Sequence, residues 1–96
     1  MSFYERKIAS FGALIREAGV MDADSGIRLV GRYSGRRCYA FVTRFGSRYT
    51  VMIYGIQRRK GGPPGRRLES EEAEGLEGLR TLLKRLVSRR VEAYAY

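Results

Sequence analysis

Polar and apolar residues alternate at period two through the middle of the chain, whereas on either side apolar residues recur at helical spacing. Three runs rich in Val, Ile, Tyr and Thr are separated by the dipeptides Ser34-Gly35 and Gly46-Ser47. Both dipeptides are typical of two-residue β-turns, and the second has the glycine-first form. We therefore predict a three-stranded antiparallel meander with strands over 27–33, 36 to 44 or 45, and 48–57.

Two-residue turns fix the register of this meander, which gives its two faces different characters. The expected pairs are Arg32 with Arg37, Val30 with Tyr39, Arg28 with Phe41, Thr43 with Thr50, Phe41 with Met52 and Tyr39 with Tyr54. One face is small or aliphatic and suits a core: Ile27, Leu29, Gly31, Cys38, Ala40, Val42, Val51 and Ile53, with Tyr49 toward its end. The other is cationic and aromatic: Arg28, Val30, Arg32, Arg37, Tyr39, Phe41, Thr43, Arg48, Thr50, Met52 and Tyr54.

Apolar residues spaced by three and four predict a helix on each side of the meander. Over 2–18 the stripe is Tyr4, Ile8, Phe11, Ile15 and Ala18, with Ser2 to Glu5 as a capping box and Gly19 just past the end. Over 70–89 it is Leu76, Leu79, Leu83 and Leu86, with Ser70 as N-cap. The alternating tail 91–96 fits a short edge strand, an intermolecular strand or a stacking tail.

These elements predict a single α+β domain over residues 1–96, in the order α-β-β-β-α, with both helices packed on the aliphatic face. The acidic residues Glu69, Glu71, Glu72 and Glu74 are interpreted as the solvated start of the second helix, where the helix dipole favours carboxylates. They are therefore not interpreted as a metal site.

Composition narrows the function classes. The chain has no histidine and a single cysteine, Cys38, which removes the usual general base, a disulfide within the chain and a four-cysteine zinc site. We expect no enzyme activity, metal or cofactor, and we expect Cys38 in the core. No apolar run is long enough to span a bilayer and the N-terminus does not resemble a signal peptide, so a cytoplasmic location is expected. The absence of asparagine and the excess of arginine suggest a thermophilic source or a GC-rich genome.

Charge is concentrated where the aromatic residues are. The net charge is +9, and residues 25–68 contain eleven lysines and arginines but no aspartate or glutamate. Within this segment, 58–67 reads Arg-Arg-Lys-Gly-Gly-Pro-Pro-Gly-Arg-Arg, which we interpret as a flexible basic loop able to clamp phosphates. The candidate nucleic-acid-binding residues are Arg28, Arg32, Arg37, Tyr39, Phe41, Arg48, Tyr54, Arg58, Arg59, Lys60, Arg66 and Arg67. A dimer interface, or a helix lying over this face, would explain the same sheet residues.

A helix, a three-stranded meander and a leucine-rich helix, in a small chain rich in Arg and Tyr, resemble the ThermoDBP-related single-stranded DNA-binding proteins of archaea. The resemblance spans most of the chain and rests on element order, size and the basic aromatic middle. It implies sequence-independent binding of single-stranded DNA by a homo-oligomer, a dimer or tetramer, with DNA held between subunits. Of those features, only the basic and aromatic residues of the sheet and loop can be placed on this sequence.

The sequence therefore predicts a binder of single-stranded nucleic acid that combines counterion release by arginines with stacking on aromatic rings. DNA is favoured over RNA by the resemblance alone. The alternatives are an RNA-binding or ribosome-associated protein, an oligomeric protein-interaction adaptor, and a protein that coats double-stranded DNA.

Overall fold

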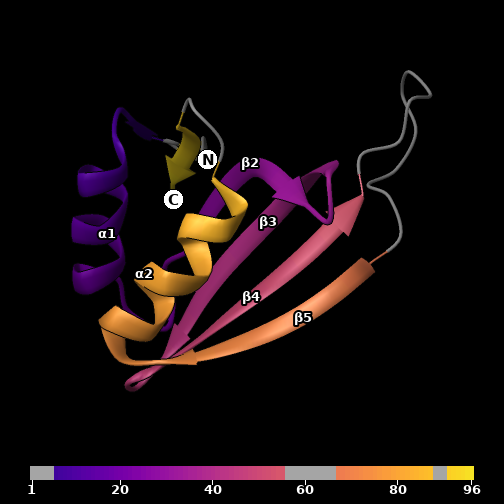
Figure 1. Cartoon of the computed structure of the whole chain (residues 1–96). Helices are drawn as coiled ribbons and strands as arrows, with labels where there is room; N and C mark the ends of the chain where they lie inside the picture. The colour runs from indigo at the N-terminus through magenta and orange to yellow at the C-terminus, as the bar shows by residue number, and fades with distance from the viewer. Residues whose placement is uncertain (1–5, 56–66, 88–90) are drawn as a thin grey trace.

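The computed structural model describes residues 6–55, 67–87 and 91–96 and shows an α+β fold (Figure 1). Its elements are β1 (Arg6–Ile8), α1 (Phe11–Val20), β2 (Ile27–Tyr33), β3 (Arg36–Phe45), β4 (Arg48–Gly55), β5 (Arg67–Glu74), α2 (Gly75–Leu86) and β6 (Glu92–Ala95). All described pairings are antiparallel, and the strand order is β1-β6-β2-β3-β4-β5. The expected three-stranded sheet is therefore the middle of a six-stranded one.

The meander itself is confirmed in position and in register. β2 and β3 have the predicted bounds, all six predicted cross-strand pairs are present, and β4 is described as far as Gly55. Ser34 and Gly35 both have positive φ, at 52° and 78°, and Gly46 has φ 63°. These are the conformations that two-residue hairpin turns require, so local turn chemistry determines the strand alignment.

The N-terminal helix is shorter than predicted and begins later. Residues 6–8 form β1, and α1 begins after Ser10, whose side chain accepts a hydrogen bond from the Ala13 amide. Ser10 is therefore the N-cap, and the predicted capping box at Ser2 lies outside the described residues. The prediction that the helix ends before Gly19 was wrong, since α1 continues to Val20. Ile8 was placed on the helix stripe, but it is a buried residue of β1.

The second helix was predicted to begin at Ser70, and this was also wrong. Residues 67–74 form β5, which pairs with β4, and α2 begins at Gly75 (Figure 1). Gly75 has φ 71°, a conformation that favours glycine, and its amide donates to the Ser47 carbonyl at 2.7 Å. The predicted acidic helix start is therefore an acidic strand that turns sharply into α2.

The alternating tail forms β6, which is inserted in the sheet rather than placed at its edge. β6 pairs with β1 on one side and with β2 on the other. Tyr96 extends this pairing, because Tyr96 and Gly26 exchange two backbone hydrogen bonds of 2.9 Å. The tail is therefore a strand, but the predicted edge position was wrong, because β6 lies between β1 and β2.

Both helices pack on the aliphatic face, as predicted. Leu14 and Ala18 of α1 and Leu79, Leu82, Leu83 and Leu86 of α2 join the buried sheet residues in one core. The approach of α2 is close, since a Cβ placed on Gly31 would lie 2.2 Å from the Leu86 carbonyl oxygen. At the other end of the core, the buried Tyr49 hydroxyl donates to the Ala18 carbonyl at 2.8 Å. These contacts determine which face of the sheet the helices leave uncovered.

Candidate nucleic-acid interface

The face of the sheet opposite the helices, here called the open face, carries alternate residues of all six strands. By strand register it comprises Lys7; Glu92 and Tyr94; Arg28, Val30 and Arg32; Arg37, Tyr39, Phe41, Thr43 and Phe45; Arg48, Thr50, Met52 and Tyr54; and Ser70, Glu72 and Glu74. None of these residues is buried, so the described helices do not cover this face. Seven predicted site residues lie on it together: Arg28, Arg32, Arg37, Tyr39, Phe41, Arg48 and Tyr54.

The other predicted site residues belong to the segment between β4 and β5. Arg58, Arg59, Lys60 and Arg66 lie outside the described residues. The segment was predicted to be a loop through Arg67, but Arg67 is the first residue of β5 and pairs with Tyr54. The loop prediction is therefore corrected at this end.

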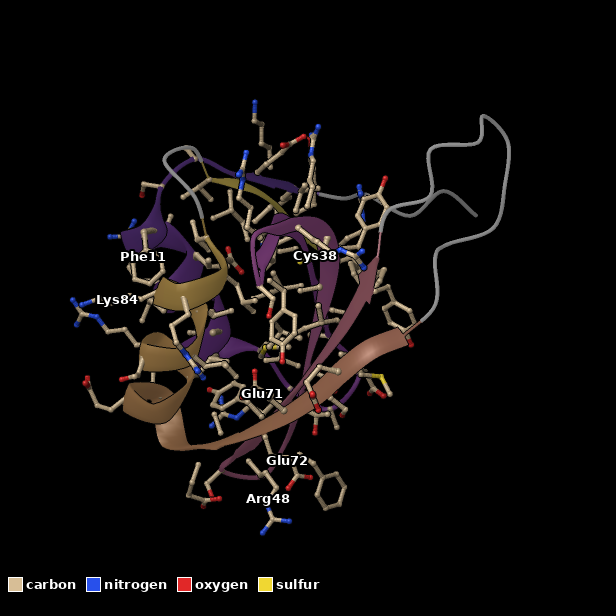
Figure 2. The ribbon with its side chains drawn as sticks, turned by 45° about the vertical axis from the view of Figure 1, so that its right-hand side comes forward. Phe11, Cys38, Arg48, Glu71, Glu72 and Lys84 are labelled. Atoms are coloured by element: carbon tan, nitrogen blue, oxygen red, sulfur yellow. The ribbon has the colours of Figure 1, made fainter. Side chains whose placement is uncertain are left out.

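The charge of the open face is lower than the sequence suggested. Folding places the carboxylates of Glu72, Glu74 and Glu92 beside the cations, although residues 25–68 contain none. Arg37 lies 3.8 Å from Glu92, and Arg48 lies 3.7 Å from Glu74. Figure 2 shows Arg48 and Glu72 together on the side of β5 away from α2. The acidic residues are thus added at β5 and β6, which flank the meander.

The two halves of the open face consequently differ in electrostatics. On the β5 side, Glu72 and Glu74 accompany Arg48, so an anion gains little there. On the β2 side, Arg28, Arg32 and Arg37 are brought together by the register of β2 and β3. The carboxylate of Glu92, the ladder partner of Val30, lies on the same side. The β2 side is therefore where a phosphate chain is most favoured.

Aromatic rings follow the centre of the open face. Phe41 and Tyr54 make an edge-to-face contact, with ring centroids 5.6 Å apart and planes at 79°. Together with Met52 and Tyr96 they line a hollow of about 420 Å³ that is open to solvent. On β6, the Tyr94 ring lies 4.8 Å from the Arg28 guanidinium. Such rings supply the flat surfaces on which unpaired bases stack, each worth ~1–3 kcal/mol.

Sequence reasoning missed Tyr94 and Tyr96 as members of this surface. Both come from the tail, whose period-two alternation indicated a strand but not its neighbour. The two tyrosines were the signal that could have placed them here, since they favoured a stacking tail, one of the three interpretations of residues 91–96. Their placement depends on β6 pairing with β2, a contact between distant parts of the chain.

Two arginines on the helix side of the sheet, Arg44 and Arg85, make contacts that stabilise the fold. The Arg44 guanidinium donates to the carbonyls of Gly19 and Met21 at 3.1 Å each, and its Nε donates to the Gly46 carbonyl at 2.7 Å. Arg44 therefore fastens the end of α1 to the turn between β3 and β4. Arg85 of α2 similarly lies 3.4 Å from Glu71, whose side chain is on the α2 side of β5 (Figure 2).

Among the residues that the structure describes, three groups have shifted pKa values, and all three lie off the open face. Hydrogen bonds from the Ser25 hydroxyl and the Asp24 amide lower the pKa of Asp22, within a turn that leads into β2. Burial, with the nearby Glu69 carboxylate, raises the pKa of Tyr33. Burial also raises the pKa of the thiol of Cys38, which lies in the core as expected. None of these groups indicates a catalytic centre.

Two further features of the described residues bear on the site. Within these ranges no group of three or more His, Cys, Asp or Glu side chains is placed to hold a metal ion. No helix in the described part of the chain is long and apolar enough to cross a membrane.

Comparison with known proteins returned no matching family model, no matching curated protein and no matching solved structure. The resemblance to the ThermoDBP-related proteins therefore stays a prediction.

Proposed function

We propose that this protein binds single-stranded DNA without sequence preference, using the open face of its sheet. The observation that carries the proposal is the position of Tyr39, Phe41 and Tyr54, which lie half-buried on a face that the described helices leave uncovered. Guanidinium groups lie on the same face, with Arg28 paired to Phe41 and Arg37 two residues from Tyr39. Cationic groups beside exposed rings suit a polyanion whose bases are unpaired.

The mechanism joins two physical effects. Phosphates would follow the β2 side, where arginines gather and carboxylates are fewer, and binding would release their counterions. Bases would turn toward β3 and β4 and stack on the rings. A duplex presents its bases already stacked and paired, so the rings would gain nothing from it. The proposal therefore includes a preference for single strands over duplex.

Assembly and location are part of the proposal. A homo-oligomer would extend the binding surface by placing two open faces along one strand, as the resemblance implies. The cytoplasm is the proposed location. The basic segment with Arg58, Arg59 and Lys60 begins a few residues after Tyr54, so its charges are proposed to add to the same surface.

The proposal is tested by titrating labelled single-stranded DNA, single-stranded RNA and duplex DNA at two ionic strengths. Affinity for single strands should fall steeply with salt, and the logarithmic slope should decrease by about 0.7 for each phosphate contact removed. Arg32→Ala should flatten the slope, and so should the triple variant of Arg58, Arg59 and Lys60 to Ala. Arg48→Ala is the matched control, because Arg48 is already paired with Glu74. Equal or tighter binding of duplex would reject the proposal.

A second candidate function is an interface between protein chains. It is favoured by the apolar lining of the hollow and by Phe45, which is 83% exposed at the end of β3. In that case Phe41→Ala and Phe45→Ala would change the sedimentation of the protein without nucleic acid. Salt-sensitive binding of oligonucleotides would then be absent.

A further inference from the structure

The hollow on the open face has a preformed floor. Phe41 and Tyr54 meet edge to face, and the Tyr54 hydroxyl lies 3.8 Å from the Met52 sulfur, toward which it donates. The hollow is thus bounded by two rings in mutual contact and by a polarizable thioether. Its remaining wall is the ring of Tyr96, which belongs to a different part of the sequence.

Tyr96 is held in place by its backbone, while its ring depends on Gly26. The two residues exchange backbone hydrogen bonds of 2.9 Å in both directions. A Cβ on Gly26 would lie 2.7 Å from Cζ of Tyr96 and 2.8 Å from its hydroxyl oxygen. The ring therefore occupies the space that the missing side chain leaves. Tyr96 is 47% exposed, so its ring forms one wall of the hollow without being buried.

We propose that this hollow receives one unpaired nucleobase, which stacks against the Tyr96 ring, and that Tyr96 is a specificity-determining residue for single strands. The inference rests on the proposed function, and in it this hollow is the part of the open face that discriminates single strands from duplex DNA. A base can lay its flat face against the rings of this hollow only when it is turned away from its partner strand. A paired and stacked base cannot enter.

The choice of a nucleobase over an apolar protein side chain comes from the flanking charge. Phe41, on the floor of the hollow, is paired with Arg28 on the neighbouring strand. The Arg28 guanidinium lies against the Tyr94 ring at 4.8 Å, which holds a positive charge beside the hollow. None of its described lining residues has an acidic side chain. A nucleotide satisfies both features, because its base is flat and its phosphate is anionic.

The lining residues also predict that the hollow does not select one particular base. Its polar atoms are the hydroxyls of two tyrosines and a weakly accepting sulfur, which do not form a donor and acceptor pattern matched to one base. The hollow should accept any base, with tighter binding for the larger stacking surface of a purine.

The experiment compares the wild type with Gly26→Ala, Tyr96→Ala and the ring-preserving control Tyr96→Phe. The ligand is a short single-stranded oligonucleotide carrying one 2-aminopurine, and the readouts are affinity and the quenching of its fluorescence. Tyr96→Ala should lose about tenfold in affinity together with the quenching, as expected for one lost stacking partner. Gly26→Ala should lose affinity in the same direction, and Tyr96→Phe should remain near the wild type.

Gly26→Ala keeps every side chain of the hollow, so a loss there cannot come from a deleted contact. If wild type and all three variants bind and quench equally, the inference falls while the proposed function stands. If the wild type binds no single strand, both fall. If Tyr96→Ala instead changes the oligomeric state in the absence of nucleic acid, the hollow is a contact between chains and the inference is overturned.

Discussion

Strand β4 carries one tyrosine on each face of the sheet, and the two meet opposite environments. Tyr49 is 1% exposed, and its hydroxyl donates to the Ala18 carbonyl of α1. Tyr54 is half-buried, beside Phe41, and its hydroxyl makes a long contact of 3.8 Å with the Met52 sulfur. In the sequence the two tyrosines look alike, because both lie in the basic, aromatic segment 25–68. The difference teaches that the face of a strand, and not its aromatic content, separates a core ring from a candidate binding ring.

The largest expected difference in stability is between two glycine substitutions, one on each face of the sheet. Gly31→Ala would place a methyl group against the Leu86 carbonyl, which is backbone and cannot move without displacing α2. We expect a loss of about 1–3 kcal/mol in the free energy of unfolding. Gly26→Ala meets only the far end of the Tyr96 ring, so its loss should stay within about 0.5 kcal/mol.

Urea unfolding followed by circular dichroism measures both glycine variants. Equal stability of Gly31→Ala and Gly26→Ala would show that α2 does not approach β2 as closely as described.

A smaller difference in stability is expected between two variants that each lose one tyrosine hydroxyl, one on each face of the sheet. Tyr49→Phe leaves the buried Ala18 carbonyl without the partner that it has in the native protein, which should cost about 1–2 kcal/mol. Tyr54→Phe removes a partly exposed hydroxyl with a weak partner, and should change stability by less than about 0.5 kcal/mol. Thermal unfolding of the two variants against the wild type gives the comparison. A larger loss for Tyr54→Phe than for Tyr49→Phe would reverse our assignment of the faces.

The smallest effect concerns alkaline pH and the helix side of the sheet. Tyr33 has its pKa raised by burial and by Glu69, so the folded protein holds this proton more tightly than the unfolded chain. Its contribution to stability is fully present below the ordinary tyrosine pKa of 10.0 and is lost as the pH rises through the raised value. Tyr33→Phe should therefore lose less stability than the wild type between about pH 9 and 11. Parallel pH profiles for the two proteins would disprove this account.

The parts of the fold that could be predicted are those determined by local chemistry. The turns at Ser34-Gly35 and Gly46-Ser47 fix two hairpins, and alternation then assigns every residue to a face. The grouping of Arg28, Tyr39 and Phe41 on the open face follows directly from that register.

The errors are at places where a distant part of the chain decides the structure. Residues 69–74 are rich in glutamate, which favours helices, yet pairing with β4 makes them a strand. β1 has three residues and exists because β6 lies beside it, a contact that no local pattern shows. The pairing of β6 with β2 places Tyr94 and Tyr96 on the open face, which is why Tyr96 was missed as a wall of the hollow.

The insertion of β6 between β1 and β2 has a consequence for how the chain is made. On the ribosome, β2, β3 and β4 can pair as soon as they emerge, because a short turn connects each strand to the next. β1 is synthesised before these strands, but its described neighbour in the sheet is β6, so it cannot pair until residues 92–95 have been made. During that interval the outer edge of β2 exposes unpaired backbone groups, and a nascent chain would be most open there to mispairing with another copy.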